Sequence, residues 1–368
     1  MKIELIYLGR RGAGGPISIE LARNLARLTP TQAVINYAVE NFDLWRQLNL
    51  DYFAVITYSS VISALSVLTF QRHIKELARQ IAAEKPDVLL FPMFHPWNAF
   101  LQDLLPSIPS VVIVHDLIPH PGIRDYIYSL LESRSFHRAA RVITFSHNQI
   151  PALIRRGVNP EKIEPVHHGI FTYYEEFYPA AASKAGFNEA CVLFFGRVTF
   201  YKGLDILLRA FRSVQARFPK AQLTIAGQGD LRPYTRLIRD LQNVKILNRW
   251  IEESEVSTIF QNASIVVLPY VEASQSGVIP IAAAFALPVI ATNVGSLPEQ
   301  IDHGKTGILV PPESPEALAD AIVGLLFDPA AARCLGQNLK TTYQSERNWE
   351  IISRQIYGIC EKVNREKN

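Results

Sequence analysis

Cysteine is scarce in this sequence of 368 residues, and charge of either sign is in short supply. The three cysteines, Cys191, Cys334 and Cys360, form no CxxC pair, which excludes a disulfide-stapled miniprotein and predicts reduced thiols in a reducing compartment. Charged residues make up 19% of the chain and the net charge is only +3. This balance excludes a protein whose main task is to grip nucleic acid, and the length suits two globular domains.

Common motifs for metals and nucleotides are also absent. The nine histidines include no HxxxH pair, and no DxD is present to hold a metal against a diphosphate, so no metal site is expected. No P-loop pattern GxxxxGK[ST] occurs, and the GxG at residues 12–14 lacks the third glycine of a dinucleotide fingerprint. A nicotinamide dehydrogenase is therefore disfavoured, and no cofactor is predicted.

No apolar run reaches the roughly 20 residues that a membrane-spanning helix requires. Residues 273–298 carry no charge at all, but Pro280 and Pro288 interrupt them, so we interpret this stretch as buried interior. Residues 1–4 include an acid and lead directly into a strand pattern, without the apolar segment of a signal peptide. A cytoplasmic location is the resulting expectation.

Short runs rich in Val, Ile, Leu and Phe alternate with helical patterns along most of the chain. Such continuous runs are typical of strands covered on both faces, and their alternation with helices predicts an α/β fold with parallel sheets. The expected strands are residues 3–8, 34–39, 53–57, 88–91, 111–114, 142–145, 191–195, 223–226, 244–247, 265–268, 289–291 and 307–310. The clearest helix places Leu204, Leu207, Phe211, Val214 and Phe218 on one face.

The chain changes character near its middle. Residues 171–190 show neither period, and a new strand–glycine–helix unit follows them. We therefore expect a first Rossmann-like domain over residues 1–170, a linker over 171–190, a second Rossmann-like domain over 191–345 and a terminal helix over 346–368.

Three glycine-bearing loops are candidates for phosphate binding. The first spans residues 9–16, where Gly14 and Gly15 precede a helix whose amino terminus could face an anion. The alternative is a tight strand–helix turn capped by Ser18, and the loop by itself favours that alternative.

In the second loop, Gly196, Arg197 and Lys202 follow a strand and precede a helix. Arginine supplies a planar fork and lysine a point charge, and together they can clamp a diphosphate. The alternative is a pair of solvated cations. It is weakened because cations at a helix amino terminus oppose the helix dipole, a conflict that an anionic ligand would relieve.

The third loop carries Glu272 after a strand and then small residues before a buried helix. The backbone N–H groups of Ser276, Gly277 and Val278 are expected to form an anion-binding nest, and Glu272 can accept hydrogen bonds from sugar hydroxyls. A helix-capping role for Glu272 is the alternative, but it does not explain Gly277.

Polar residues also follow two strands of the first half. His115 and Asp116 come directly after residues 111–114, and His95 follows residues 88–91. Open α/β sheets bind ligands at the carboxyl ends of their strands, so these groups are candidates for polar or acid–base roles. A lone histidine there is more often structural, but two of them favour a site.

These motifs, taken together, resemble a known enzyme family. The segments GR…KG (196–203), IAGQG (225–229), LPYVE (268–272), PVIATNVGSLPE (288–299) and GKTG (304–307) are similar to the carboxy-terminal half of family-four retaining glycosyltransferases. The resemblance is strong over about residues 190–310 and weaker in the first half, where the glycine loop, His115-Asp116 and Ser146 fit. It implies the GT-B architecture, two Rossmann-like domains facing across a cleft, with the tail helix from Trp349-Glu350 crossing back.

The resemblance also implies an activity: transfer of a hexose from a nucleotide sugar to a glycan or lipid-linked acceptor, with retention and without a required metal. Glu272, which would touch the donor sugar, and His115, near the transferred sugar, would be catalytic; His95 and Asp116 are candidate acceptor or sugar contacts. One departure is Pro280, which stands where the family usually has a second Glu that holds the ribose. The implied donor-binding residues are Gly14, Gly15, Gly196, Arg197, Lys202, Ser276, Gly277 and Val278.

Other interpretations stay open. A GT-B nucleotide-sugar epimerase would act on the donor alone, and a sugar-nucleotide-binding protein with lost activity would explain Pro280. Basic residues of the first half and the apolar run 60–70 are consistent with peripheral contact at the inner membrane face. A solvated helix face beside a buried helix explains the same features. The basic residues are Arg10, Arg11, Arg23 and Arg27.

Overall fold

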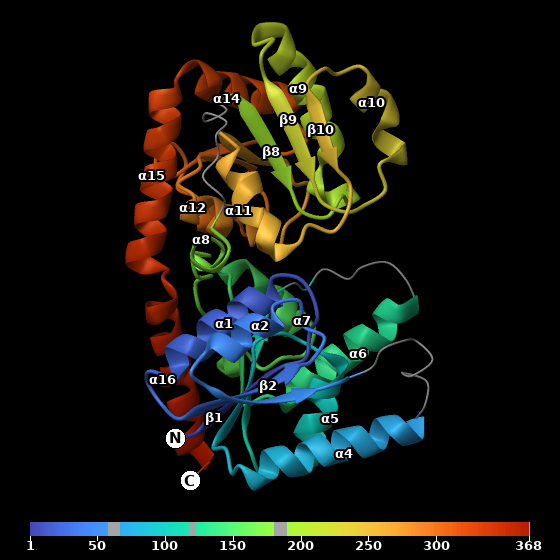
Figure 1. Ribbon diagram of the computed structural model, residues 1–368, viewed down its shortest axis with the longest axis vertical. Coiled ribbons are helices and arrows are strands. Elements are labelled where there is room, and N and C mark those ends of the chain that lie inside the picture. The colour runs from blue at the N-terminus through green and yellow to red at the C-terminus, as the bar shows by residue number, and fades with distance from the viewer. Residues whose placement is uncertain (58–66, 116, 118–122, 180–189, 368) are drawn as a thin grey trace. The chain divides into compact units, whose positions relative to one another are not determined.

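The computed structural model describes residues 1–57, 67–115, 117, 123–179 and 190–367, with the side chains of 67–70 and 123–126 left aside. The chain forms two compact units. The first comprises Met1–His167 together with Trp349–Asn368, and the second comprises His168–Asn348. Each unit is a parallel sheet between helices (Figure 1), which confirms the predicted α/β class.

The first unit contains a seven-stranded parallel sheet in the order β3-β2-β1-β4-β5-β6-β7. Its strands are β1 (Ile3–Tyr7), β2 (Thr31–Asn36), β3 (Asp51–Val55), β4 (Val88–Phe91), β5 (Ser110–Val114), β6 (Arg141–Thr144) and β7 (Ile163–Pro165). Its described helices are α1 (Gly14–Leu25), α2 (Phe42–Gln47), α4 (Val67–Ala83), α5 (Pro96–Leu104), α6 (Ile123–Arg138), α7 (Ile150–Arg155) and α16 (Trp349–Lys367).

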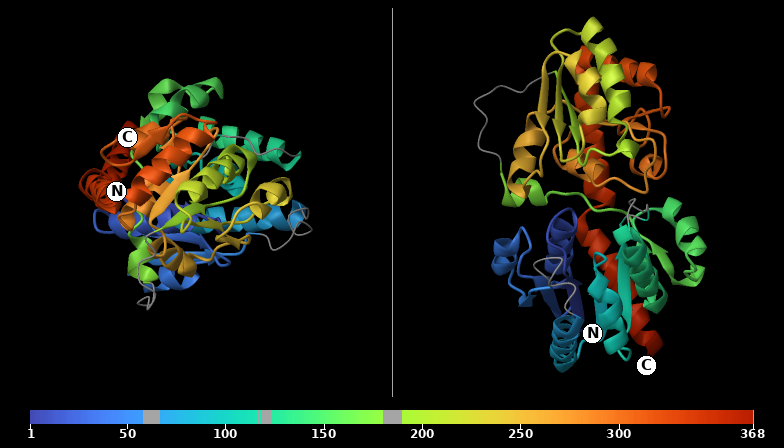
Figure 2. Two further views of the ribbon diagram at one scale, coloured as in Figure 1. Left: turned by 90° about the horizontal axis from the view of Figure 1, so that it is seen from above. Right: turned by 90° about the vertical axis from the view of Figure 1, so that its right-hand side faces the viewer.

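Helices cover both faces of this sheet, and its central strands are accordingly buried on both sides. Helices α4, α5 and α6 contribute to one hydrophobic core, in which Ile81, Trp97 and Phe136 are almost completely buried. The terminal helix α16 packs along α1, and its apolar face includes Ile356 and Cys360. Residues from the two ends of the sequence therefore complete one unit (Figures 1 and 2).

The second unit contains a six-stranded parallel sheet in the order β10-β9-β8-β11-β12-β13. Its strands are β8 (Cys191–Phe195), β9 (Gln222–Ala226), β10 (Val244–Leu247), β11 (Ile265–Leu268), β12 (Val289–Thr292) and β13 (Ile308–Val310). Its described helices are α8 (Tyr173–Phe177), α9 (Leu204–Arg217), α10 (Thr235–Arg239), α11 (Glu253–Gln261), α12 (Val278–Ala284), α13 (Leu297–Gln300), α14 (Pro315–Phe327) and α15 (Pro329–Glu346).

The uncharged stretch 273–298 contains α12 and β12, which lie in the interior of the second unit, whereas Asn293, Gly295 and Pro298 near its end are exposed. Every residue of α12 and of β12 is buried. A segment enclosed in this way has no water to solvate a charge, which accounts for its composition. None of the described helices is both long and apolar enough to cross a bilayer.

The predicted strands are all present, with ends displaced by at most three residues. Four of them match to the residue: Val88–Phe91, Cys191–Phe195, Val244–Leu247 and Ile265–Leu268. The sequence did not indicate β7, which has only three residues and contains Glu164 and Pro165. A short helix, α8, forms within the stretch 171–190, which was expected to show no regular structure. The three cysteines are free thiols, and burial raises the pKa of Cys360 to about 12.

The features that suggested membrane contact are only partly described by the structure. Arg23 is not a free surface cation, because its Nε lies 2.8 Å from a carboxylate oxygen of the buried Glu20. The apolar run 60–70 lies outside the residues whose side chains are described.

A buried carboxyl group lies in the middle of the first sheet. Glu4 is in β1, in register with Gln32 of β2 and Leu89 of β4, and its side chain is inaccessible to solvent. Neither carboxyl oxygen has a hydrogen-bond partner among the described residues. Burial raises the pKa of Glu4 from 4.5 to about 8, while Lys2 lowers this pKa and Glu84 raises it.

This raised pKa predicts a pH-dependent stability. The folded protein keeps the Glu4 proton that the unfolded chain releases above about pH 4.5, so the free energy of unfolding should fall as the pH rises from about 4.5 to about 8. Glu4→Gln should flatten this slope and stabilise the protein at pH 8 by about 2 kcal/mol or more. Denaturation at several pH values measures both. The control is Glu76→Gln, an exposed carboxyl of α4; a slope unchanged in Glu4→Gln contradicts the prediction.

Candidate functional site

The loops at the carboxyl ends of the strands in the second unit contain glycines that let backbone touch backbone. Gly196 follows β8 with φ +117°, and Gly227 follows β9 with φ +143°. A Cβ on Gly227 would lie 2.0 Å from the Gly196 carbonyl oxygen, closer than any side chain tolerates. The Gly196 N–H also donates to the Ala226 carbonyl at 2.9 Å. These contacts fix the start of the loop that carries the predicted cations.

Lys202 ends a short 3-10 helix, Phe200–Lys202, that connects this loop to α9. Its Nζ donates a hydrogen bond to the Tyr270 hydroxyl at 2.6 Å and lies 4.1 Å from the centre of the Tyr270 ring. Within the described part of the chain, no carboxylate lies within ion-pair distance of this ammonium group. Lys202 is thus a partly buried cation whose hydrogen-bond partner is neutral.

Arg197 lies on the same loop with its side chain exposed. The next residue, Val198, donates its N–H to the Gln228 carbonyl at 2.9 Å, so the loops after β8 and β9 run together here as well. The structure therefore places Gly196, Arg197 and Lys202 on one anchored loop at the carboxyl edge of the sheet, where open α/β sheets bind ligands.

Gly203 joins the lysine loop to the loop after β11. Its φ is +64°, and a Cβ there would lie 1.9 Å from the Pro269 carbonyl oxygen. On the other side of Lys202, the Tyr201 carbonyl accepts a hydrogen bond from the Val271 N–H at 2.8 Å. The backbone therefore holds Lys202 from both sides.

The third predicted loop differs from expectation at its backbone amides. Glu272 is exposed in the first half of this loop, as a sugar contact would require. The Ser276 N–H, however, donates to Gln300 Oε1 at 2.9 Å, and the Val278 N–H donates to Ser276 Oγ at 3.2 Å. The N–H groups of Ser276 and Val278 are therefore satisfied by side chains in this structure, and donor binding at these residues stays a prediction. Among the predicted three, only the N–H of Gly277 remains to be offered to a ligand.

Pro280 occupies the third position of α12 and is buried. Proline is tolerated in the first turn of a helix because the N–H groups there have no partner within the helix. Its carbonyl accepts a hydrogen bond from the Phe171 N–H at 3.3 Å. Pro280 is thus part of the packing and supplies no polar side chain to a ribose.

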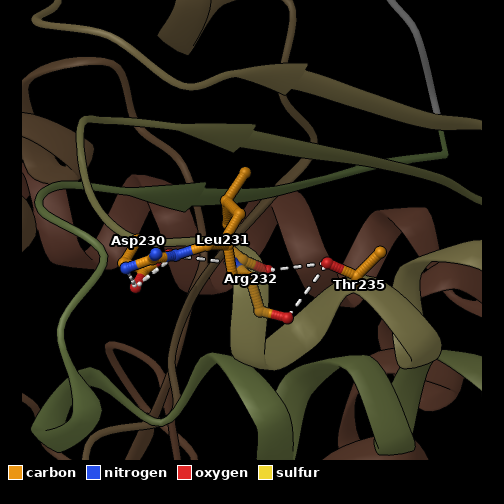
Figure 3. A network of polar contacts seen from close by, with 4 residues as sticks. All are labelled: Asp230, Leu231, Arg232 and Thr235. Atoms are coloured by element: carbon orange, nitrogen blue, oxygen red, sulfur yellow. Dashed lines mark hydrogen bonds and ion pairs between the residues drawn. The ribbon is translucent and has the colours of Figure 1, made fainter.

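The loop after β9 ends in a local polar cluster (Figure 3). Arg232 donates to both carboxylate oxygens of Asp230, with its Nη2 2.7 Å from one of them, and Thr235 Oγ1 donates to the Leu231 and Arg232 carbonyls. The hydrogen bonds from Arg232 lower the pKa of Asp230 to about 2. Both charges of this pair are mutually satisfied, so the cluster shapes the loop.

In the first unit, Gly14 and Gly15 lie inside α1 and not in a loop before it. A Cβ on Gly14 would lie 2.8 Å from Cε2 of Tyr7, a buried residue of β1. Ser18 is not the helix cap, because its Oγ donates to the Gly14 carbonyl at 2.6 Å. Close packing of the helix on Tyr7 explains Gly14, and phosphate binding by this pair stays a prediction.

The two predicted histidines lie at the ends of adjacent strands. His115 follows β5, and its Nε2 lies 2.7 Å from the Pro92 carbonyl oxygen in the loop after β4, so this nitrogen carries the proton. His95 caps α5: its Nδ1 accepts a hydrogen bond from the Trp97 N–H at 3.2 Å. Burial, followed by the charge of Arg10, lowers the pKa of His95 to about 3. His95 therefore caps α5 in this structure, and its role as an acceptor or sugar contact stays a prediction. Asp116 lies outside the described residues.

Sequence reasoning missed the partners of the predicted groups. Tyr270 has no predicted role beyond its place in the LPYVE segment (268–272), yet its hydroxyl binds Lys202. Gln300 belongs to none of the predicted motifs, yet its side chain binds both the N–H and the carbonyl of Ser276, each at 2.9 Å. Lys202 and Tyr270 lie on the loops that follow β8 and β11. These two strands are neighbours in the sheet, which explains why the two side chains meet.

A cavity of about 320 Å³ in the second unit lies elsewhere. It is lined by Ile265, Leu287, Pro288, Leu326 and Arg333 among others, at the amino ends of β11 and β12. Parallel sheets bind ligands at the opposite edge, so the glycine-anchored loops define the candidate site.

Comparison with known proteins identifies the family to which both units correspond. The model of the group 1 glycosyl transferases matches residues 189–328, and the model of glycosyltransferase family 4 matches residues 19–172. The chain belongs to this family of glycosyltransferases. The two matches together extend over most of both units.

Curated relatives carry related names. An uncharacterized glycosyltransferase of Methanocaldococcus jannaschii is 26% identical over 241 residues, which are 62% of this chain and 62% of that protein. An alpha-D-kanosaminyltransferase of Streptomyces kanamyceticus is 26% identical over 321 residues, 81% of this chain and 82% of the relative.

A solved structure shows the same fold. The Anabaena protein HepE, in complex with UDP and glucose, superposes with a TM-score of 0.74 at 17% identity, over 97% of this chain and 99% of that protein. The fold of this glycosyltransferase is therefore of the GT-B type, as the sequence resemblance implied.

The contact at Gly203 makes a prediction about stability. Gly203→Ala should destabilise the protein by about 3 kcal/mol or more, because the new Cβ meets the Pro269 carbonyl in addition to the strain of a positive φ. The matched control is Gly304→Ala, which has φ +77° but nothing within 4 Å of the new Cβ, and it should cost about 1 kcal/mol. Thermal or urea denaturation compares the two; equal losses would show that the contact with Pro269 does not matter.

Proposed function

We propose that this glycosyltransferase moves a hexose from a nucleoside diphosphate sugar to a glycan or lipid-linked acceptor, with retention of the anomeric configuration and without a metal. The observation that carries the proposal is the environment of the Lys202 ammonium group. Its ammonium group lies at the carboxyl edge of the second sheet, bonded to a neutral hydroxyl and to no carboxylate of the described chain. A cation in this state suits an anionic ligand, and a diphosphate is the anion that such a donor carries.

The comparisons support the donor class. The Anabaena protein of similar fold was solved with UDP and glucose. The Streptomyces relative is named for transfer of a kanosaminyl group, whereas a further relative from Pseudomonas aeruginosa is named a D-rhamnosyltransferase. Because these names differ in the sugar, the proposal extends to a hexose and no further.

The proposed chemistry requires neutralisation of the departing nucleoside diphosphate. Lys202 supplies a point charge, and Arg197, exposed on the same loop, supplies a planar fork that can grip two phosphate oxygens. Charges fixed in advance at the place where negative charge develops are an effective source of catalysis. Glu272 would hold hydroxyl groups of the transferred sugar.

The first unit would supply the acceptor side of the reaction. The Nε2–H of His115 is used by the Pro92 carbonyl, so this ring is held in a fixed orientation at the end of β5. We propose His115 as a catalytic residue, as the family resemblance implies. Retention without a dedicated nucleophile implies attack on the same face that the diphosphate leaves, with the departing phosphate oxygen accepting the proton of the acceptor hydroxyl.

Donor binding is tested with a lysine variant and a matched lysine control. UDP, GDP or ADP at about 100 times its Kd should raise the melting temperature of the wild type by roughly 5 °C or more, and the base that does so identifies the donor. Lys202→Met should abolish most of this shift. Lys220→Met, an exposed lysine preceding β9 at the opposite edge of the same sheet, should leave it intact.

If none of the three nucleotides shifts the wild-type melting temperature, the proposed donor class is wrong. If Lys202→Met and Lys220→Met behave alike, the assignment of Lys202 is wrong.

The stereochemistry and the absence of a metal requirement are tested on the product. With the donor identified, the anomeric proton coupling in the NMR spectrum of the product should match that of the donor. EDTA should change the transfer rate by no more than about twofold, because the cations of the loop supply the charge that a metal would otherwise supply. Inversion, or loss of transfer restored by Mg²⁺, would contradict the proposal. Conversion of the donor sugar without any acceptor would favour the epimerase alternative.

A further inference from the structure

The partner of Lys202 is unusual for a lysine that is only partly exposed. The hydrogen bond from Nζ goes to the phenol of Tyr270 at 2.6 Å, and the same nitrogen lies 4.1 Å from the centre of that ring and 5.8 Å from the centre of the Tyr201 ring. The phenol is a hydroxyl group that can accept this hydrogen bond, and it is not a carboxylate counter-ion. Tyr270 therefore orients the ammonium group without cancelling its charge.

Tyr270 is itself rigidly held. Its side chain is buried, with 1% of its surface exposed, and its carbonyl accepts a hydrogen bond from Thr292 Oγ1 at 2.5 Å. On either side of it in sequence, the Pro269 carbonyl contacts Gly203 and the Val271 N–H donates to the Tyr201 carbonyl. The hydroxyl group therefore has one position relative to the lysine loop, set by the backbone of β11 and β12.

The remaining sides of the ammonium group stay available to a ligand. An ammonium group has three N–H donors, and the Tyr270 hydroxyl takes one of them. The absence of a side chain on Gly196 leaves space beside it, since a Cβ there would lie 3.6 Å from Nζ. A carboxylate in place of the phenol would compete with a phosphate for the same charge, whereas the phenol does not.

We propose that Tyr270 is a positioning residue for Lys202, which holds the ammonium group in the orientation that binds the diphosphate of the donor. This inference rests on the proposed function, in which Lys202 binds that diphosphate. The alternative is that Tyr270 is only a packed aromatic residue whose hydroxyl is incidental.

A double-mutant cycle separates the two. The variants are Tyr270→Phe, Lys202→Met and the double variant, in the full-length protein. The affinity for the nucleoside diphosphate selected among UDP, GDP and ADP is measured by calorimetry. Tyr270→Phe removes only the hydroxyl and should weaken binding about tenfold, as expected for a lost hydrogen bond to a charged group.

In the Lys202→Met background, Tyr270→Phe should change the affinity by less than about twofold, since no ammonium group is left to orient. Tyr201→Phe is the matched control, because its ring lies near the same nitrogen but its hydroxyl is not the hydrogen-bond partner. It should bind like the wild type. The melting temperature of each variant without nucleotide reports any general loss of packing.

Each outcome decides a separate question. Wild-type affinity in Tyr270→Phe, or the same weakening with and without Lys202, overturns the positioning role while leaving the proposed function in place. Wild-type affinity in Lys202→Met overturns the diphosphate assignment of Lys202 and the inference that rests on it. Absence of binding by the wild type to all three nucleotides overturns the proposed function and the positioning role together.

Discussion

Direct contact between backbones at the carboxyl edge of the second sheet is the constraint on which the candidate site depends. Gly203 lies on the Pro269 carbonyl, Gly227 on the Gly196 carbonyl and Gly295 on the Ala273 carbonyl, each with a positive φ. Glycine alone meets both conditions without strain. The loops after β8, β9, β11 and β12 are thereby joined at fixed distances, so the charged side chains that they carry start from rigid positions.

This rigidity matters because the site keeps a cation that no carboxylate of the described residues neutralises. Lys202 precedes α9, where the helix dipole disfavours positive charge. Asp205 in the first turn of that helix moderates the dipole, and the Tyr270 hydroxyl accepts one hydrogen bond. Neither group forms an ion pair with the ammonium. The structure therefore tolerates a local electrostatic cost that a bound anion would relieve, which is a common mark of a functional site.

The fold was largely predictable from the sequence because strands buried on both faces leave a strong pattern. Continuous apolar runs such as Val111–Val114 within β5 are typical of parallel strands that helices cover on both faces. Strand β7 escaped prediction because Glu164 and Pro165 disguise a short strand. Glycine was the ambiguous signal. Gly203 shapes a loop of the candidate site, whereas Gly14 makes room for Tyr7 inside a helix, and nothing in the local sequence separates these two uses.

The candidate site was predictable only as far as single residues and their strand ends. Which atoms satisfy one another depends on contacts between distant parts of the chain: Gln300 occupies the Ser276 amide from 24 residues away, and Tyr270 receives Lys202 from 68 residues away. These contacts changed the interpretation in opposite directions. Gln300 binds the Ser276 N–H, which the sequence had suggested for phosphate binding. Tyr270 orients the Lys202 ammonium group without forming an ion pair with it. The positive charge of this candidate site therefore comes mainly from the side chains of one loop, and the backbone holds that loop in place.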